Sequence, residues 1–416
     1  MNKRRIVITG LGALTPIGNN VDEFFSGLAK GKNGVGLITN FDTTNFKTKF
    51  ACELKNFDSL NHFDKKTLRK TDNYCIHALV SAREAIKDSG LELDKIDKER
   101  CGVIWGSGIG GINSYETEVI EYSRNEGRHK LSPFFITKMI SNMAPGLIAM
   151  EFGFYGVNYT TVSACASSNH ALLDAYNYIQ MGDANLIIAG GSEYPITETS
   201  IGGFSSMKAI STNENYHEAS RPYDVDRDGF VAGEGAGAIV LEEYEHAKNR
   251  GAKIYAEFVG GGMSSDAYHI SAPHPEGRGA ALSMKNALKR AGISSKEIQY
   301  INAHGTSTPA GDIPELLAVK SVFEENLDNL FISSTKSMTG HLLGAAGAIE
   351  ALATIYAVKN DFIPPTINTK NLDPDIPKGI NIVTGSGKKQ MVEYALSNTF
   401  GFGGHNASVV FKKFTD

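Results

Sequence analysis

Short apolar runs rich in β-branched residues alternate along the chain with longer stretches in which apolar residues recur every three or four positions. The first pattern is typical of buried strands, and the second of helices packed on one face. Strands are predicted at RIVITG, CGVIWGSG, NYTTVSA, NLIIAGG, AGAIVLEE, KIYAEFVGGG, IQYINAHG, LFISSTKS, YALSNTFG and ASVVFKK, and helices at stretches such as YCIHALVSAREAIKDSG and ALSMKNALKRAGI. This alternation predicts an α/β protein with largely buried sheets.

A division of the chain is predicted near EYEHAKNRGAKIYAE, where a charged helix ends at Gly251 and a new strand begins. We therefore expect two halves, residues 1–250 and 251–416. The stretches TTVSACASSNHALLDA and FISSTKSMTGHLLGAA both read as a strand, a polar turn and a helix of small residues. The similarity is faint, and a chance likeness is the alternative to two structurally related halves.

Residues 341–357, HLLGAAGAIEALATIYA, predict an unusual helix. Gly344 and Gly347 would each cost about 1 kcal/mol relative to alanine inside a helix. Together with the neighbouring alanines they would give a smooth surface that another element can approach closely. We expect this helix to be buried on several sides of a layered core.

The composition is that of a soluble globular protein, with 416 residues, 41% hydrophobic and 21% charged. The formal net charge of −5 provides no overall basic field for nucleic acid. No apolar stretch is long enough to span a membrane. The stretch MNKRRIVITGLGALTPIG imitates a signal peptide, but Gly10 and Gly12 interrupt its short apolar run. We expect a strand over residues 5–9 that enters a turn, in a cytoplasmic protein.

The four cysteines are few and scattered, without a C-x-x-C pair: Cys52, Cys75, Cys101 and Cys165. Such usage indicates neither a disulfide framework nor a zinc site, and it favours a reducing compartment.

Cys165 lies where the strand-like YTTVS meets the helical pattern of SSNHALLDAYNYIQ. A strand–turn–helix junction presents a side chain at the carboxyl edge of a sheet, as a nucleophile elbow does. We expect the helix dipole to lower the pKa of this thiol and the free N–H groups to stabilise an oxyanion. The alternative is an ordinary buried cysteine, which behaves as a small apolar residue.

Two further turns carry histidines. INAHGTSTPAGDIPE places His304 just past a strand, and SSTKSMTGHLLGAAG places Lys336 and His341 before the small-residue helix. A cysteine and two histidines at strand ends form the set that a thiol enzyme needs, whereas the histidine spacing does not suggest a metal. Asp312 and Glu315 have capping-box spacing and would then only start a helix.

Glycine loops offer a competing interpretation. GSGIGG (106–111) fits the G-x-G-x-x-G pattern after a strand, and GLGALT (10–15) nearly fits it. A lone match is weak without an acidic residue at the end of a second strand. We interpret both as tight turns that let layers pack closely.

The whole chain resembles the condensing enzymes of the thiolase fold, of the β-ketoacyl-acyl-carrier-protein synthase II type. The resemblance is carried, in order, by IVITGLGALTPIG, GSGIGG, SACASS, AGGSE, RPYDVDRDGFVAGEGAGAIVLEE, MSSDAYH, AHGTSTPAGD, STKSMTGHLLGAAG and SNTFGFGGHNASVVFKK. It implies a five-layered αβαβα sandwich built from two similar halves. It also implies a homodimer that elongates acyl groups on an acyl-carrier protein (ACP) by condensation with malonyl-ACP.

The resemblance assigns roles to individual residues. Cys165 would be the nucleophile, with His304 and His341 completing a Cys–His–His set and Lys336 ordering the site electrostatically. The backbone N–H groups of Cys165 and Phe402 would hold the oxyanion. The remaining assignments are hydroxyls that hold the pantetheine arm (Thr306, Thr308), a gating phenylalanine (Phe402) and residues near the acyl pocket (Ile109, Phe135).

The resemblance also suggests a patch that faces the acidic carrier protein: Lys66, Arg69, Lys70 and Lys208. A solvated basic helix face is the alternative for these residues. The sequence departs from the family pattern at His405, where threonine is common, and at Asn213, where arginine is common. We expect no organic cofactor, and the resemblance leaves room for a monovalent cation near Asn302, Glu315 and Asn398.

Other functions fit less well. A thiolase would use a second cysteine late in the chain, and none follows Cys165. A non-catalytic chain-length subunit would lack Cys165, and a nicotinamide-dependent oxidoreductase would depend on the weak glycine loops. A ketosynthase of a polyketide or aryl-polyene-like pathway would use the same chemistry, and the sequence does not separate it from fatty acid synthesis.

Overall fold

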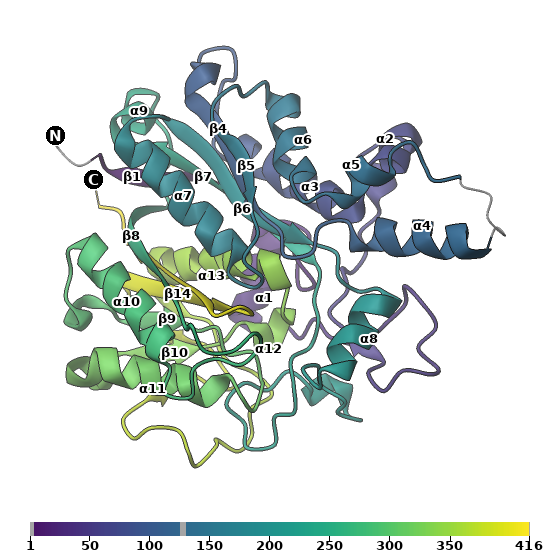
Figure 1. Cartoon of the computed structure of the whole chain (residues 1–416). Helices are drawn as coiled ribbons and strands as arrows, with labels where there is room; N and C mark the ends of the chain where they lie inside the picture. Colours follow the sequence, from purple (N-terminus) through teal and green to yellow (C-terminus); the bar gives the residue numbers. More distant parts are fainter. Residues whose placement is uncertain (1–3, 125–129, 416) are drawn as a thin grey trace.

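The computed structural model describes residues 4–124 and 130–415 (Figure 1). Its main sheet has the strand order β12-β10-β9-β14-β15-β8-β1-β7-β6-β4-β5. The strands of the first half are β1 (Ile6–Leu14), β4 (Cys101–Gly106), β5 (Asn158–Thr161), β6 (Leu186–Glu193) and β7 (Gly235–Glu243). Those of the second half are β8 (Ala256–Ser265), β9 (Tyr300–Asn302), β10 (Phe331–Ser333), β12 (Asn381–Ile382), β14 (Tyr394–Gly401) and β15 (His405–Lys412).

The sheet consists of two units with the same topology. In the first, β1, β7, β6, β4 and β5 lie side by side, and in the second β8, β15, β14, β9 and β10 follow the same order. Each unit starts with two antiparallel pairings and continues with two parallel ones. The units join where β1 and β8 pair at only two positions, Val7 with Glu257 and Ile8 with Ala256. This confirms a fold built from two similar halves.

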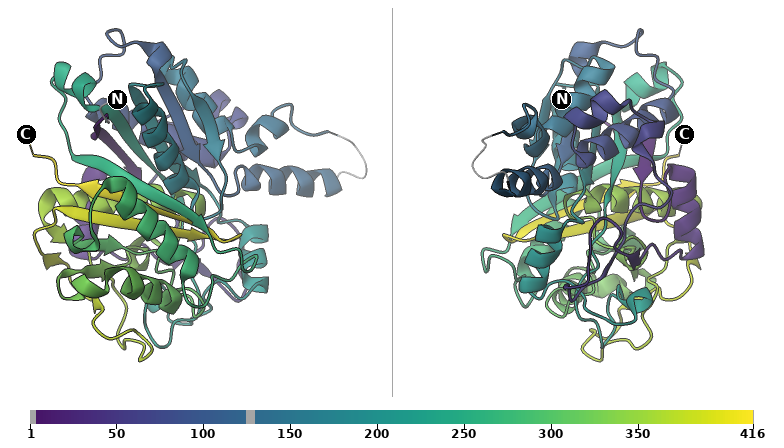
Figure 2. Two further views of the ribbon diagram at one scale, coloured as in Figure 1. Left: turned by 60° about the vertical axis from the view of Figure 1, so that its left-hand side comes forward. Right: turned by 90° about the vertical axis from the view of Figure 1, so that its right-hand side faces the viewer.

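Helices form three layers around these two units (Figure 2). Between the units lie α7 (Ser167–Met181) and α13 (Ala346–Asn360), and their side chains share one core with inner-face residues of both units. Outside the first unit pack α3 (Asn73–Asp88) and α6 (Met143–Phe152), and outside the second pack α10 (Arg278–Ala291) and α11 (Asp312–Phe323). Strands covered on both faces favour apolar runs, and LIIA at the start of the fully buried β6 is one.

The remaining elements lie at the edges and ends of the layers. They are α1 (Val21–Lys30), α2 (Lys65–Lys70), α4 (Ile112–Arg124), α5 (Phe135–Met139), α8 (Glu198–Ser206), α9 (Tyr244–Asn249), α12 (Lys336–Thr339), and the short strands β2 (Gly36–Leu37), β3 (Phe50–Ala51), β11 (Phe362–Ile363) and β13 (Lys388–Lys389). In Figure 1, α4 projects from the side of the layered body. Over the described ranges, none of the helices has the length and apolar character required to cross a membrane.

Two sequence predictions about glycines need correction. The strand expected at residues 5–9 continues to Leu14 and does not turn at Gly10. The prediction that layers pack closely at these glycines is confirmed. A Cβ at Gly12 would lie 1.9 Å from the Ser81 carbonyl oxygen of α3. The helix expected from residue 341 begins only at Ala346, so Gly344 belongs to a preceding 3-10 turn, Leu343–Ala345.

Candidate active site

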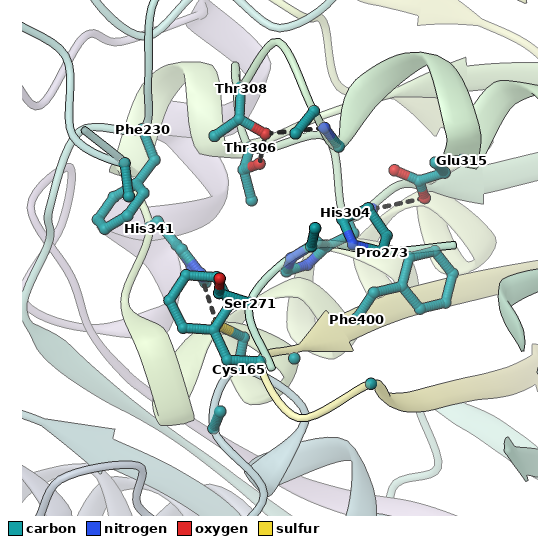
Figure 3. Close-up of a pocket in the computed structure, with 18 of the residues that line it drawn as sticks. Cys165, Phe230, Ser271, Pro273, His304, Thr306, Thr308, Glu315, His341 and Phe400 are labelled. Carbon is teal, nitrogen blue, oxygen red and sulfur yellow. Dashed lines mark hydrogen bonds between the residues drawn. The ribbon is translucent and has the colours of Figure 1, made fainter. Parts of the chain in front are cut away.

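Cys165, His304 and His341 come together at the carboxyl ends of three strands (Figure 3). Cys165 follows β5, His304 follows β9 and His341 follows β10. The ligand-type atoms of the three side chains all lie within 4.8 Å of one another. His341 Nε2 is 3.0 Å from Cys165 Sγ, and the two imidazole ring centroids are 5.3 Å apart. The separation of 3.0 Å is within the hydrogen-bonding reach that a thiol nucleophile and its general base require.

Each of the three loops contains a non-glycine residue with a left-handed backbone. The φ angles are 51° at Ala164, 68° at Ser307 and 47° at Leu343. Such conformations cost free energy and persist only where the surroundings impose them. Ala164 turns the chain between β5 and α7, so Cys165 stands directly before the amino end of a buried helix.

A cavity of about 500 Å³ leads from the protein surface to the sulfur of Cys165. Half-exposed Met207 and neighbouring Lys208 line its outer part. Its inner wall is apolar and belongs to one packed cluster, with Ile109, Phe204, Phe230 and Leu343 all lining the cavity. Thr306 and Thr308 also line it, with their hydroxyl oxygens 3.0 Å apart. The lining therefore combines an apolar wall with a pair of hydroxyl groups.

The expected low pKa of the nucleophile is wrong. Burial raises the pKa of the Cys165 thiol to about 12, and the charge of Lys336 and a hydrogen bond from the Phe402 backbone N–H only partly offset this rise. Phe402 lies on the loop after β14, and this loop is so close that a Cβ at Gly401 would lie 3.1 Å from the Cys165 nitrogen. The resting group is therefore a neutral thiol beside an imidazole.

Both imidazoles are neutral. Burial lowers the pKa of His304 and of His341 well below 6.5, and the nearby Lys336 charge lowers them further. A neutral imidazole can accept a proton at one ring nitrogen and donate one from the other. The pair can thus serve both a thiol and a carbonyl oxygen.

Lys336 is buried and forms an ion pair with the buried Glu350 of α13. Glu350 was missed from the sequence because it stands alone among small apolar residues. Burial raises the pKa of Glu350 to about 7, against the effect of Lys336. A buried lysine needs such a partner, since an unpaired buried charge is costly.

The interpretation of Asp312 and Glu315 as a simple helix cap is wrong. The helix α11 does begin at Asp312, but its first residues hold the preceding loop instead. Glu315 accepts hydrogen bonds from the backbone N–H groups of His304 and Gly305, both at 2.8 Å. Asp312 accepts one from the N–H of Thr308 at 3.3 Å. Both carboxylates therefore fix the loop that carries His304.

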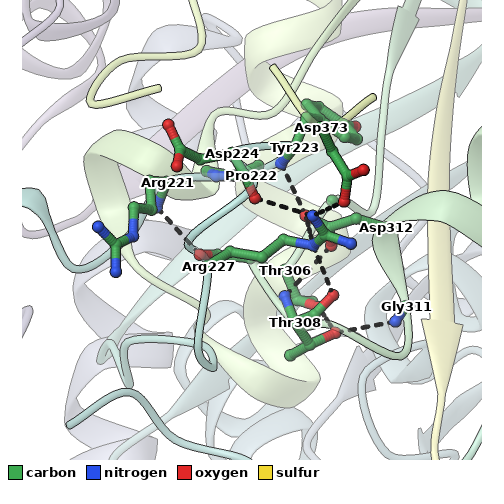
Figure 4. Close-up of polar contacts among 12 residues, drawn as sticks. Arg221, Pro222, Tyr223, Asp224, Arg227, Thr306, Thr308, Gly311, Asp312 and Asp373 are labelled. Atoms are coloured by element: carbon green, nitrogen blue, oxygen red, sulfur yellow. Dashed lines mark hydrogen bonds and ion pairs between the residues drawn. The ribbon is translucent and has the colours of Figure 1, made fainter. Parts of the chain in front are cut away.

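The segment RPYDVDRDG also holds this loop through polar contacts (Figure 4). Arg227 donates from Nε to the Thr308 carbonyl oxygen at 3.1 Å and from Nη1 to Asp373 at 2.6 Å. The Tyr223 N–H donates to Asp312 at 2.9 Å. Arg227 also forms an ion pair with Asp312 at 3.6 Å, so its planar guanidinium contacts two carboxylates and the Thr308 carbonyl oxygen.

The two residues predicted near the acyl pocket differ in position, and the residues of the predicted carrier-protein patch lie mostly outside the cavity. Phe135 is on α5 and does not line this cavity, unlike Ile109. Lys66, Arg69 and Lys70 are on α2, which contributes nothing to the cavity, whereas Lys208 lines its outer part. The two departures from the family pattern, exposed His405 and turn-forming Asn213, also lie outside the cavity lining.

The glycine loop GSGIGG cannot cradle a phosphate. The N–H groups of Gly108 and Ile109 donate to the buried carboxylate of Glu193, at 2.7 and 3.1 Å. An anion already occupies these donors, so they are unavailable to a second one. Glu193 lies in the AGGSE motif, and no spacing in the sequence pointed to this contact.

The duplicated five-layered α/β fold holds a buried cysteine and two imidazoles in one cavity, which is the arrangement expected from the resemblance to condensing enzymes of the thiolase fold. A family model described as beta-ketoacyl synthase, N-terminal domain, matches residues 3–247, and the corresponding C-terminal domain model matches residues 255–370. The chain belongs to the beta-ketoacyl synthase family.

Relatives match over the whole chain. The 3-oxoacyl-[acyl-carrier-protein] synthase 2 of Synechocystis sp. (strain ATCC 27184 / PCC 6803 / Kazusa) is 46% identical over 415 residues, covering 100% of this chain and 99% of the relative. The synthase of the same name from Staphylococcus aureus (strain COL) is 47% identical over 411 residues, covering 99% of each chain.

Solved structures share the fold throughout. A beta-ketoacyl synthase from Burkholderia phymatum STM815 superposes with a TM-score of 0.90 at 34% identity, covering 99% of this chain and 100% of that one. A type II polyketide ketosynthase, solved in complex with its acyl-carrier protein, gives a TM-score of 0.91 at 32% identity and covers 100% of both chains.

Proposed function

We propose that this protein condenses acyl-ACP with malonyl-ACP to 3-oxoacyl-ACP, the elongation step of type II fatty acid biosynthesis. The observation that carries the proposal is the convergence of Cys165, His304 and His341 at the inner end of a cavity that opens to the surface. Full-length similarity to 3-oxoacyl-ACP synthases supports the same reaction. The protein is accordingly an acyltransferase.

Acyl transfer comes first. His341 Nε2, 3.0 Å from the sulfur, accepts the thiol proton as Cys165 Sγ attacks the thioester carbon of acyl-ACP. The backbone N–H groups of Cys165 and Phe402 stabilise the tetrahedral oxyanion. The intermediate collapses by breaking the bond to the pantetheine sulfur, which leaves as a thiol with the proton from His341. The acyl chain remains on Cys165.

Condensation follows when malonyl-ACP replaces the free carrier. Thr306 and Thr308 bind the pantetheine arm. Loss of carbon dioxide leaves an enolate, whose oxygen accepts hydrogen bonds from the neutral imidazoles of His304 and His341. The enolate carbon attacks the acyl carbon on Cys165 and the carbon–sulfur bond breaks. The thiolate then takes up a proton from solvent, which is the proton consumed in the decarboxylative condensation. The product is two carbons longer.

The partners are acyl-ACP and malonyl-ACP. Support comes from the related ketosynthase solved with its acyl-carrier protein and from Lys208 at the outer part of the cavity. Lys66, Arg69 and Lys70 on α2 belong to the same proposal as a basic patch for an acidic carrier. The protein acts as a homodimer in the cytoplasm, where its four free cysteines stay reduced.

No organic cofactor is needed, and a monovalent cation is part of the proposal. The Asn302 side-chain oxygen is buried without a hydrogen-bond partner, which fits an oxygen ligand for a cation. Glu315 and Asn398 lie next to each other, with the Asn398 amide nitrogen 3.3 Å from Glu315 Oε1. In this proposal the side-chain oxygens of Asn302, Glu315 and Asn398 hold the ion.

A polyketide or aryl-polyene-like ketosynthase is the second candidate. It would use the same residues. The ishigamide ketosynthase/chain length factor superposes at 31% identity, and a type II polyketide ketosynthase at 32%. The identity of 46–47% to 3-oxoacyl-[acyl-carrier-protein] synthases 2 over the full length favours the first candidate.

Product analysis tests the proposal. The purified protein is incubated with malonyl-ACP and acyl-ACPs of graded chain length, and the products are identified by mass spectrometry. We expect saturated acyl-ACPs to give 3-oxoacyl-ACPs longer by two carbons. Exclusive use of polyketide or polyene intermediates would favour the second candidate, and no elongation with any acyl-ACP would refute the first.

A further inference from the structure

The carboxylate of Glu193 at the end of β6 is buried and fully engaged. Its Oε1 accepts hydrogen bonds from the Ser107 hydroxyl and the Ile109 N–H, both at 3.1 Å. Its Oε2 accepts the N–H groups of Gly108 at 2.7 Å and Gly344 at 2.9 Å. Burial raises the pKa of Glu193 to about 7, although these four hydrogen bonds lower it. All four groups are donors, so they stabilise the ionised form, and such bonds are about twice as strong as neutral ones. This one side chain therefore binds two loops from different halves of the molecule.

The two loops touch each other backbone to backbone at this point. A Cβ added to Gly344 would lie 2.2 Å from the Gly108 nitrogen and 2.6 Å from Glu193 Oε2. A Cβ added to Gly108 would lie 2.9 Å from the same oxygen. The glycines are required because the carboxylate and both backbones share one small volume.

Each loop presents one apolar side chain to the catalytic cavity. Ile109 and Leu343 both line it and pack in one cluster with Phe204 and Phe230. Ile109 is held at its own N–H, and Leu343 has a left-handed backbone with φ 47° directly before the held Gly344. Glu193 itself does not line the cavity, so it affects the cavity wall only through the two loops that it binds.

We propose that Glu193 is the positioning residue that fixes the apolar wall of the acyl pocket and thereby sets the acyl chain length that the enzyme accepts. The inference rests on the proposed condensation function. A chain that overruns the pocket must push Ile109 and Leu343 apart, and the four hydrogen bonds at Glu193 oppose this movement. When the hydrogen bonds at Glu193 are weakened, the two loops can move apart and the pocket accepts longer acyl chains.

The test is Glu193→Gln, in which the new amide NH2 faces backbone N–H donors instead of accepting from them. The kcat/KM for acylation of Cys165 is measured with acyl-ACPs from short to long. In the wild type, kcat/KM falls for acyl chains longer than the preferred length. We expect this fall to be roughly tenfold smaller in the variant, which corresponds to the loss of one charge-assisted hydrogen bond. Amide hydrogen exchange at Gly108, Ile109 and Gly344 should become faster in the same variant.

Glu84→Gln is the matched control. Glu84 is also a largely buried carboxylate with two backbone N–H donors, Ala13 and Val21, each at 2.8 Å, but it belongs to the outer helix α3. Its replacement should leave the chain-length profile unchanged. Should Glu193→Gln fail to fold, Gly108→Ala pushes the loop away from the carboxylate and should flatten the profile in the same direction.

The outcomes separate this inference from the proposed function. A wild-type protein that takes no acyl group from any acyl-ACP would overturn the proposed function and the inference with it. A wild-type protein that is acylated, with a Glu193→Gln profile that keeps its shape or loses kcat/KM equally at every length, would overturn the inference alone.

Discussion

Two strand-to-helix junctions meet in the middle layer, β5–α7 in the first half and β10–α13 in the second. They occupy equivalent places in the two sheet units, and the Ser168 hydroxyl of α7 accepts a hydrogen bond from the Ala348 N–H of α13 at 2.9 Å. The first connection, residues 162–166, is a bare turn that carries Cys165. The second, residues 334–345, contains α12 and a 3-10 turn, and carries Lys336 and His341.

The difference shows how a duplicated fold divides one reaction between its halves. The short junction holds the nucleophile rigidly against a helix end. The longer one has room for a buried lysine with its partner Glu350 and for an imidazole that reaches back to the sulfur of the first half. In the proposed mechanism the first half binds the acyl group covalently, and the second controls protons and charge.

The largest effect should follow removal of an imidazole from the second half. His304→Ala and His341→Ala should lower the rate of malonyl-ACP decarboxylation about 100- to 1,000-fold, the usual loss for one oxyanion donor. The Kd for malonyl-ACP should change little, because the imidazoles act on the enolate. Carbon dioxide release and carrier binding are measured separately. Unchanged decarboxylation in both variants would remove the assigned role.

Breaking the ion pair of the second junction should destabilise the fold. Lys336→Met leaves Glu350 buried and unpaired, which should lower the free energy of unfolding by about 3–5 kcal/mol. In the wild type the pKa of Glu350 is about 7, and Lys336 lowers it, so this pKa should rise further in the variant. The loss of unfolding free energy relative to the wild type should therefore be larger above pH 7, where only the wild-type carboxyl has a cation to stabilise its charge. Urea unfolding measures it. The double variant Lys336→Met/Glu350→Leu should recover most of the stability, and a double variant as unstable as the single one would contradict this account.

The acid limb of the pH–rate profile should move when Lys336 is removed. In the wild type, burial and the Lys336 charge keep the pKa of both histidines well below 6.5, so decarboxylation should not decline as the pH falls through 6.5. Without the lysine charge the imidazolium forms are less disfavoured. Both pKa values therefore rise and activity is lost at a higher pH. The folded double variant Lys336→Met/Glu350→Leu is suitable for this profile, and an unshifted acid limb would argue against electrostatic control by Lys336.

The smallest effect should come from the support of the pantetheine loop. Arg227→Lys keeps the charge but loses the planar fork that bonds Thr308 and Asp373. We expect the KM for malonyl-ACP to rise about fivefold, for roughly one hydrogen bond, with kcat nearly unchanged. Steady-state kinetics would show this, and a fall in kcat at constant KM would contradict it.

The sequence predicted the strands and the residues at their ends better than their environment. Cys165, His304 and His341 were identifiable because each follows a strand, and the structure places these ends together at one edge. The raised pKa of Cys165 was not predictable, because it depends on burial by loops far away in the sequence.

Buried carboxylates were the main omission. Glu193 lies in a buried strand and Glu350 in a helix of small residues. The sequence around each of them has no spacing that predicts which residue the carboxylate contacts. Glu315 was visible, but capping-box spacing gave it a local explanation, whereas its carboxylate reaches back to the loop of His304. Such long-range polar contacts follow from the packing of layers and leave no periodic signal.

Acyl transfer to Cys165 is the most direct test of the central claim. The wild type and Cys165→Ala are incubated with acyl-ACP, and their intact masses and peptide maps are compared. We predict that the wild type gains one acyl group on the peptide containing Cys165, and that Cys165→Ala gains none while keeping its fold. Acylation that persists in the variant, or that maps to another residue in the wild type, would contradict the account.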